Sequence, residues 1–235
     1  MNEAVLAAWL AAARVHPETA PAWMTTLVDR VARMGAGDLS RNDPPAAEVG
    51  PRQAAVLILL GNDSASGPDV LLQQRAAGLR DHPGQVSFPG GSREEGDLSP
   101  VQTALREAVE ETGLDPHGVD PVALLPRLYI PPSRFQVSGV VAYWRHPSAV
   151  AAVDHGENAA VMRIPLSRLA DPGNRLTVRN TRGWEGPAFA LEGMVIWGYT
   201  GEVLDALLRS GGWELPWRRT PAVDLDRVWE TVRGG

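Results

Sequence analysis

The chain has no cysteine among its 235 residues. Disulfides, thiolate zinc sites and a cysteine nucleophile are therefore excluded, and the composition is compatible with a reducing compartment. The five histidines are scattered, and no two of them stand at the spacing of a pair of zinc ligands. A zinc site is therefore disfavoured.

Long runs of one kind of residue are also missing. No apolar run is long enough to span a bilayer and no secretory signal is visible, so we expect a cytoplasmic protein with no membrane partner. The formal net charge is -6, and Lys and Arg form no block, which argues against a nucleic-acid surface. The expected partner is a small molecule.

The composition is that of a globular protein, with 44% hydrophobic and 21% charged residues, and it predicts one main domain. Helical patterns and the turn residues Asn42-Asp43-Pro44-Pro45 predict an N-terminal helical extension and linker over residues 1–45. The main domain is expected over residues 46–212. A C-terminal tail with a short helix is expected over residues 213–235.

Short apolar runs bounded by turn residues predict a series of strands. They cover residues 54–60, 70–74, 122–130, 136–144, 159–164, 176–179 and 194–197. A helix from Tyr199 to Arg209 follows, and Gly211-Gly212 ends it. Strands with interspersed helices predict an α/β fold in which helices cover both faces of a mixed sheet.

The C-terminal segment is rich in tryptophan. Trp213, Trp217 and the segment 224–232 offer apolar surface that needs a partner. They cover either the domain itself or the second subunit of a homodimer, and the sequence leaves both alternatives open.

Three carboxylates form the most informative pattern of the chain. Glu107, Glu110 and Glu111 are related by steps of three and four residues, so they line one face of an α-helix. Like charges at this spacing repel each other. A hard divalent cation such as Mg²⁺ or Mn²⁺ prefers carboxylate oxygens and would neutralise them. The alternative is a solvated acidic helix face.

The boundaries of this helix are signalled by its flanking residues. Ser99 is a typical N-cap, Pro100 takes the first helical position, and Gln102 stands three residues after the cap. Gly113 can adopt the left-handed conformation that ends a helix. Apolar positions recur on the face opposite the carboxylates, at Val101, Ala104, Leu105, Ala108 and Thr112. One side of the helix is therefore expected to pack, and the other to face a cleft.

A glycine pair precedes the helix in Phe88-Pro89-Gly90-Gly91, and it suits close approach of the backbone to an anionic ligand. Together with Asp97, Arg106, the three glutamates and Gly113, this stretch resembles the Nudix box. That box is the signature of hydrolases that cleave a nucleoside diphosphate linked to another moiety. The family's usual Glu is Asp97 here, and one extra residue precedes Arg106. The resemblance implies an α/β/α sandwich.

A second resemblance lies upstream. The residues Leu71-Leu72-Gln73-Gln74-Arg75-Ala76, then Arg80, Gly84 and the glycine pair, follow the spacing of the coenzyme A pyrophosphatase signature of a Nudix subfamily. Only Gln73 departs, at a position where that pattern usually has Thr. Some bacterial members of the subfamily share the Asp and the extra residue of the box. The resemblance covers roughly residues 50 to 210.

The resemblance implies roles for the acidic residues and for Arg106. Glu107, Glu110 and Glu111 would hold Mg²⁺ or Mn²⁺, and one of them, or a loop acid such as Glu157, would accept the proton of the attacking water. Which acid is the base stays open, and Glu157 could equally be an exposed loop carboxylate. Arg106 is expected to pair with a carboxylate and fix its rotamer.

The expected substrate-binding residues are Arg75, Arg80, Gly90 and Gly91. Coenzyme A carries an extra phosphate on its ribose, and a guanidinium outside the metal cluster suits that phosphate. The alternative for both arginines is a solvated or salt-bridged surface position.

Together the two resemblances predict a metal-dependent hydrolase that cuts coenzyme A or its thioesters into 3',5'-ADP and a 4'-phosphopantetheine product. The first alternative is a Nudix enzyme that acts on ADP-ribose, a nicotinamide dinucleotide or a deoxynucleoside triphosphate. The second is a non-catalytic Nudix domain that senses a nucleotide, and this alternative would predict loss of the metal-binding glutamates.

Overall fold

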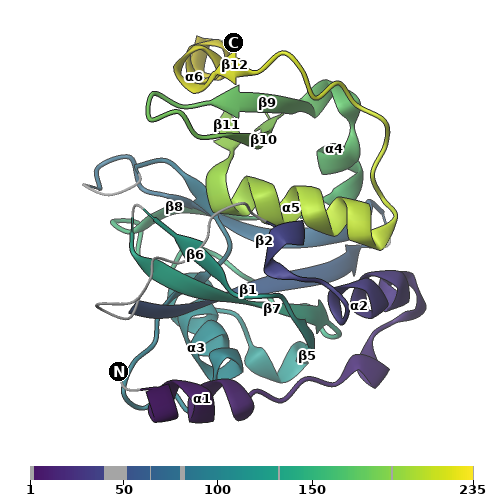
Figure 1. Ribbon diagram of the computed structural model, residues 1–235, viewed down its shortest axis with the longest axis vertical. Coiled ribbons are helices and arrows are strands. Elements are labelled where there is room, and N and C mark those ends of the chain that lie inside the picture. The colour runs from purple at the N-terminus through teal and green to yellow at the C-terminus, as the bar shows by residue number, and fades with distance from the viewer. Residues whose placement is uncertain are drawn as a thin grey trace.

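Two β-sheets alternate with layers of helix along the long axis of the molecule (Figure 1). The computed structural model describes residues 3–39, 52–63, 65–79, 83–131, 133–191 and 193–234. Within these ranges no helix combines the length and the apolar character that a membrane crossing requires.

The N-terminal part is helical, as predicted. Helix α1 covers Glu3–Ala11 and α2 covers Thr25–Val31, with short 3-10 turns at Pro17–Thr19, Ala22–Met24 and Ala36–Asp38. Leu27, Val28 and Val31 of α2 are buried in the main hydrophobic core. The linker predicted at residues 42–45 lies outside the described residues.

The large sheet is mixed, as expected from the sequence. Its strands are β1 (Arg52–Asp63), β2 (Gly67–Arg75), β3 (Val86–Ser87), β4 (Gly90–Ser92), β5 (Val119–Leu124), β6 (Leu128–Ile130), β7 (Phe135–Trp144) and β8 (Asn158–Pro165). The order is β3-β2-β1-β7-β5, with β4 on β1, β6 on β7 and β8 on β2. Strands β1 and β7 are parallel, and the other pairs are antiparallel.

One predicted strand is divided in the structure. The run expected over residues 122–130 forms β5 and β6, and the two are separated by Pro126, which has no backbone N–H to donate to a ladder. The remaining helices are α3 (Pro100–Thr112), α4 (Leu166–Ala170), α5 (Gly198–Gly211) and α6 (Leu225–Gly234). The helix predicted from Tyr199 to Arg209 is thus confirmed as α5.

A second, smaller sheet was not predicted. It contains β9 (Arg175–Arg179), β10 (Glu185–Leu191), β11 (Met194–Ile196) and β12 (Val223–Asp224), in the order β11-β10-β9-β12. Strand β10 contains Gly186-Pro187, two residue types that are rare inside strands, yet Pro187 pairs with Thr177 of β9. Tertiary packing therefore overrides the local preference, because Ala188 and Phe189 are fully buried.

The C-terminal segment packs against its own domain. Leu225 and Val228 of α6 are buried against the small sheet. The ring of Trp213 lies 6.1 Å from that of Trp23, between the centroids. This segment therefore covers its own chain, and the homodimer stays a prediction.

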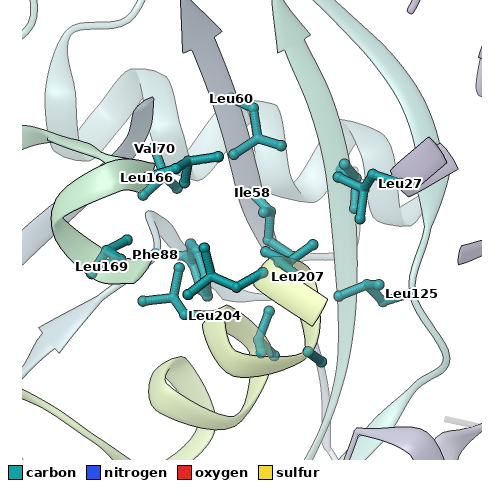
Figure 2. Packing of buried hydrophobic residues seen from close by; sticks show 14 of the residues in the cluster. Leu27, Ile58, Leu60, Val70, Phe88, Leu125, Leu166, Leu169, Leu204 and Leu207 are labelled. Carbon is teal, nitrogen blue, oxygen red and sulfur yellow. The ribbon is translucent and has the colours of Figure 1, made fainter. Parts of the chain in front are cut away.

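The two faces of the large sheet carry separate cores. On β1, Ala55, Leu57 and Leu59 belong to the core beneath α3, while Ile58 and Leu60 belong to the core beneath α5. This alternation has the period of two that a strand buried on both faces requires. Figure 2 shows Leu204 and Leu207 of α5 beside Phe88, which belongs to the segment between β3 and β4.

Candidate active site

The glycine pair lies inside the large sheet, where β1 and β2 separate. The two strands pair with each other only near their hairpin, from Leu60 with Val70 to Asp63 with Gly67. Beyond Leu60 and Val70, residues 86–92 lie between the two strands. The first of these residues pair with β2 and the last with β1. The Nudix glycines therefore lie on the sheet beneath α3, which packs against both β1 and β4.

Each glycine has a steric reason to be there. At Gly90, φ is +153°, and a Cβ atom would lie 2.5 Å from the carbonyl oxygen of Ala55. At Gly91, a Cβ atom would lie 2.5 Å from Oε1 of Glu107. The first glycine lets the backbone pair with β1, and the second leaves room for the carboxylate of Glu107.

Helix α3 begins and ends at the residues predicted. The Ser99 side chain accepts a hydrogen bond from the backbone N–H of Gln102 at 3.2 Å. The Gln102 side chain reaches back and accepts from the N–H of Leu98 at 2.8 Å. Gly113 has a φ of 67°, in the left-handed region. These caps fix the register of the helix, and with it the direction of its glutamates.

Arg106 lies among carboxylates. Its guanidinium donates to both carboxylate oxygens of Asp97, at 3.1 and 3.0 Å, and to Glu107 at 3.1 Å and Glu110 at 3.0 Å. It also donates to the backbone carbonyl of Ser92, at the end of β4, at 3.0 Å. The arginine therefore ties the acidic face of α3 to the strand that carries the glycines.

Asp97 is the buried anchor of this arrangement, at 3% exposure. Burial opposes its charge, but the hydrogen bonds from Arg106, from the backbone N–H of Glu94 and from the Thr103 hydroxyl together lower its pKa. The shorter acid at the irregular position of the box thus binds Arg106.

Glu111 is the most buried of the three helix glutamates, at 8% exposure. Its Oε2 accepts a hydrogen bond from the backbone N–H of Gly90 at 2.8 Å. Burial raises the pKa of Glu111 to about 7, the charges of Glu107 and Glu157 add to this, and hydrogen bonds from Gly90 and the Gln73 side chain oppose it. At neutral pH this group therefore exchanges a proton readily.

The other two glutamates are more accessible. The side chain of Glu107 is 16% exposed and that of Glu110 is 56% exposed. Burial raises the pKa of Glu107, and the nearby charge of Arg106 offsets only part of the effect. In the described part of the chain, no three acidic or histidine side chains form a ready metal cluster. The contacts explain this, because Glu107 and Glu110 turn to Arg106 while Glu111 turns to Gly90.

The donor set nevertheless fits a hard divalent cation. Glu107 and Glu111 are carboxylates with pKa values raised by burial, so each gains from a nearby positive charge. Arg106 donates hydrogen bonds to Glu107 and Glu110, whereas Glu111 accepts one from Gly90 instead. The sequence predicts that Glu107, Glu110 and Glu111 would hold Mg²⁺ or Mn²⁺, and this assignment stays a prediction.

Sequence reasoning gave no role to Gln73, which the structure brings to this site. The residue is 1% exposed, and its side chain is one of the groups that lower the pKa of Glu111 against the effect of burial. Two signals pointed to it: the departure from the signature at this position, and its place two residues after Leu71, on the same face of β2.

The predicted substrate residues are only partly described. Arg75 ends β2 and is half-buried, and its Nε atom has no hydrogen-bond partner in the structure as described. Its strand partner is Asn158, the residue after Glu157. Arg80 lies outside the described residues. The structure thus brings Glu107, Glu111, Gly90, Gly91 and Arg106 together, whereas Arg75 lies at the neighbouring strand end.

Similar proteins agree with the geometry of this site. A "Nudix hydrolase NudL" of Cronobacter sakazakii, named as uncharacterized, is 41% identical over 116 residues, which are 49% of this chain and 58% of the relative. A protein of the same name from Salmonella paratyphi B is 35% identical over 66% of this chain and 81% of its own length. "Nudix hydrolase 15, mitochondrial" of Arabidopsis thaliana is 34% identical over 66% of this chain and 56% of its own length. The chain therefore spans little more than half of some relatives.

A solved structure supports the fold. The crystal structure of RenU, a Nudix hydrolase from M. smegmatis, superposes with a TM-score of 0.50 at 19% sequence identity, over 74% of this chain and 94% of that chain. The family model of the NUDIX domain matches residues 51–178, which include the glycine pair, α3 and its glutamates. The match covers more than half of the 235 residues, and the chain belongs to the NUDIX domain family.

Proposed function

We propose that this chain is a cytoplasmic, metal-dependent pyrophosphohydrolase that cleaves the diphosphate of coenzyme A or an acyl-CoA into 3',5'-ADP and (acyl-)4'-phosphopantetheine. The observation that carries the proposal is the contact between Glu111 and Gly90. It joins the acidic helix to the segment that resembles the coenzyme A pyrophosphatase signature. Both resemblances therefore concern one site.

The chemistry of diphosphate hydrolysis matches these residues. A diphosphate repels a nucleophile, so the reaction needs positive charge near the phosphates and a base for the water proton. When bound, Mg²⁺ or Mn²⁺ supplies that charge, and Glu107, Glu110 and Glu111 would hold it. Arg106 fixes the directions of two of these carboxylates through its hydrogen bonds.

Glu111 is the strongest candidate for the base. Its pKa is raised to about 7 by burial, and a base works best when its pKa lies near the working pH. Glu107 and Glu157 are the alternatives, because the charges of both act on Glu111. The hydrogen bond from Gly90 holds the Glu111 carboxylate in one direction while it accepts a proton.

Recognition of coenzyme A rests on the arginines. Among the described residues the Nε donor of Arg75, at the end of β2, has no hydrogen-bond partner, and its planar guanidinium suits a phosphate. The glycine pair stays a predicted part of the substrate site, although the space at its two Cα atoms is taken by the backbone of Ala55 and the carboxylate of Glu107. Arg80 belongs to the same signature.

The test is a product assay. Purified protein is incubated with Mg²⁺ and coenzyme A, acetyl-CoA, ADP-ribose, NADH or a deoxynucleoside triphosphate, and the products are weighed by mass spectrometry. We expect 3',5'-ADP and phosphopantetheine from coenzyme A, at the highest kcat/KM of the set. Faster cleavage of another compound would overturn the substrate assignment, and binding without any product would indicate a nucleotide sensor.

A further inference from the structure

A basic pocket lies where the C-terminal ends of α2 and α5 meet. The two helices pack against each other on the face of the large sheet opposite to α3 (Figure 1). Between them is a cavity of about 210 Å³, which we call the α2–α5 pocket. Its polar lining residues are Arg30, Arg33, Asp38, Arg209 and Ser210. Three arginines against one aspartate make this pocket positive, although the whole chain has a formal net charge of -6.

Hydrogen bonds hold two of these arginines at the rim of the pocket. The guanidinium of Arg30 donates to the backbone carbonyl of Arg209 at 2.8 Å. Arg209 donates from Nη2 to the backbone carbonyl of Asp38 at 3.5 Å and from Nε to the carboxylate of Asp205 at 3.2 Å. These bonds connect α2, α5 and the turn between them and the masked-free end of α2 at Asp38, so a ligand would meet donors that are already positioned.

The alternative is that the arginines only stabilise the ends of their helices, where positive charge is favourable. Arg30 fits this alternative, because its acceptor is a carbonyl in the last turn of α5. Arg33 does not fit it. This residue follows the end of α2, and within the part of the chain that the structure describes its side chain enters no hydrogen bond or ion pair. Its guanidinium therefore offers all five N–H donors to a ligand.

The negative charge of the pocket is already engaged. The carboxylate of Asp38 accepts a hydrogen bond from the backbone N–H of Gly35 at 2.8 Å, and among the described residues it forms no ion pair with the arginines. The hydroxyl of Ser210 adds a neutral donor to the lining. The pocket thus has more donors and positive charge than its own residues satisfy.

Charge and size together identify the class of ligand. Guanidinium groups bind phosphate through parallel hydrogen bonds, and a phosphate group has more oxygen atoms for three arginines than a carboxylate has. Sites for drug-sized ligands measure about 300–1,000 Å³. A cavity of about 210 Å³ is smaller, so it suits one or two phosphate groups and not a whole nucleotide.

We propose that the α2–α5 pocket binds a phosphate-bearing anion, with Arg33 as the residue that contacts the phosphate most directly. The ligand is either an inorganic phosphate or the phosphate end of a larger molecule that extends out of the pocket. This site lies on the opposite face of the large sheet from the glutamates of α3. The proposal therefore does not depend on the proposed hydrolase activity.

The experiment measures binding of inorganic pyrophosphate by titration calorimetry, at low ionic strength and with EDTA present. We expect Arg33→Gln to raise the Kd by about tenfold or more, the low end for loss of a hydrogen bond to a charged group. The matched control is Arg14→Gln. Arg14 is also exposed and donates to a carbonyl at the end of a helix, that of Ala11 at 2.8 Å, but it does not line the pocket. Both variants lose one positive charge, so only a local effect separates them.

A second variant keeps all three arginines. Ser210→Asp adds a negative charge to the lining, and it should also raise the Kd for pyrophosphate by about tenfold or more. Thermal unfolding shows that each variant is folded. Pyrophosphate should raise the thermal midpoint of the unaltered protein and of Arg14→Gln, and should raise that of Arg33→Gln and Ser210→Asp less.

Two further ligands define the anion. Succinate, a dicarboxylate, should bind at least about tenfold more weakly than pyrophosphate, and equal affinity would overturn the assignment to phosphate. ADP has the same two phosphate groups on a nucleoside. Tighter binding of ADP would support a larger phosphorylated ligand, and equal or tighter binding of pyrophosphate would support an inorganic one.

The proposal is overturned if the unaltered protein shows no saturable binding of pyrophosphate. It is also overturned if Arg33→Gln leaves the Kd within twofold, or if Arg33→Gln and Arg14→Gln raise it equally. These measurements use no divalent cation and no cleavage, so either result leaves the proposed hydrolase activity untouched.

Discussion

Two clusters of this protein each consist of arginines and carboxylates, and they differ in their balance of charge. Around Arg106, four carboxylates lie within 4.0 Å of one guanidinium: Glu94, Asp97, Glu107 and Glu110. Around Arg175, on the small sheet, two carboxylates face three arginines: Asp205 and Glu214 with Arg175, Arg209 and Arg219. The first cluster has a surplus of negative charge, and the second does not.

The two central arginines also differ in how far they are exposed to solvent. The side chain of Arg175 is fully buried, and its guanidinium lies 4.4 Å from the ring centroid of Trp217 and 5.5 Å from that of Phe189. Arg106 is 21% exposed, and Glu110 beside it is more exposed still. The centre of the Arg175 cluster, the pair of Arg175 and Asp205, is thus sealed from solvent, and the cluster has no surplus of negative charge, which suits a structural role. The Arg106 cluster is open and acidic, which suits an added cation.

The largest effect is expected in the sealed cluster. Asp205→Asn leaves Arg175 buried with an incomplete counter-charge, and the free energy of unfolding should fall by about 3–5 kcal/mol. Urea denaturation measures this, and Mn²⁺ affinity should stay unchanged. The control is Glu185→Gln, which breaks the exposed pair with Arg179 and should cost less than about 1 kcal/mol. If both variants lowered the free energy of unfolding by similar amounts, the buried Arg175–Asp205 pair would contribute no more to stability than the exposed Arg179–Glu185 pair.

The open cluster should respond in the opposite way. Glu110→Gln and Glu111→Gln each remove a charge from an acidic face, so turnover should fall by at least about a hundredfold while stability stays equal or rises. Turnover at saturating Mg²⁺ and the thermal midpoint are measured together. The control is Glu95→Gln, an exposed acid of the loop that precedes α3. Near-native turnover in Glu110→Gln or Glu111→Gln would refute the predicted metal ligands.

Gly91 tests whether the open cluster depends on the space that a glycine leaves. In Gly91→Ala the new Cβ would meet the Glu107 carboxylate, a flexible side-chain end that can move away. We therefore expect a folded protein with Mn²⁺ affinity lowered on the order of tenfold, since small displacements of a ligand are felt strongly. Gly96→Ala is the control, because nothing lies within 4 Å of its Cβ position. Unchanged affinity would show that Glu107 does not need its present position.

Arg75 lies at the end of β2, outside the open cluster, and it is one of the predicted substrate-binding residues. Arg75→Ala should lower kcat/KM for coenzyme A about tenfold more than for its analogue without the 3'-phosphate, at the low end for a charge-assisted hydrogen bond. Arg80→Ala should act in the same direction. Steady-state kinetics with both compounds decides it, and equal losses would mean that neither arginine contacts that phosphate.

The sequence predicted one of these clusters and missed the other. The acidic helix has local signals at every level, from the Ser99 cap to the spacing of its glutamates and the left-handed Gly113, and all of them are confirmed as structure. Arg175 and Asp205 are far apart in the chain and meet only because α5 packs against the small sheet to which β9 belongs. No pattern of neighbouring residues in the sequence predicts such a contact.

The same difference between local patterns and contacts of distant residues explains the errors in the predicted fold. Strand β10 contains Gly186-Pro187 and forms because its neighbours β9 and β11 are available on either side. Gln73 was visible as a departure from a signature, but Glu111, whose pKa it helps to lower, lies on another element, and only the packing of α3 on the sheet relates the two. Sequence reasoning thus found the residues of local patterns, and tertiary contacts supplied the remainder.

The smallest effect expected is a pH dependence of metal binding, and its sign follows from Glu111. Burial raises the pKa of Glu111 from 4.5 to about 7, so the metal-free folded state holds a proton that a cation must displace. This group's contribution to stability is fully present below pH 4.5 and is lost as the pH rises through about 7. Affinity for Mn²⁺ should accordingly rise about twofold from pH 7 to pH 8.5, and more steeply below pH 7. In Glu111→Gln this dependence should disappear, whereas Asp205→Asn should keep it. A flat profile in the unaltered protein would mean that Glu111 is already ionised at pH 7 and has no proton for the cation to displace.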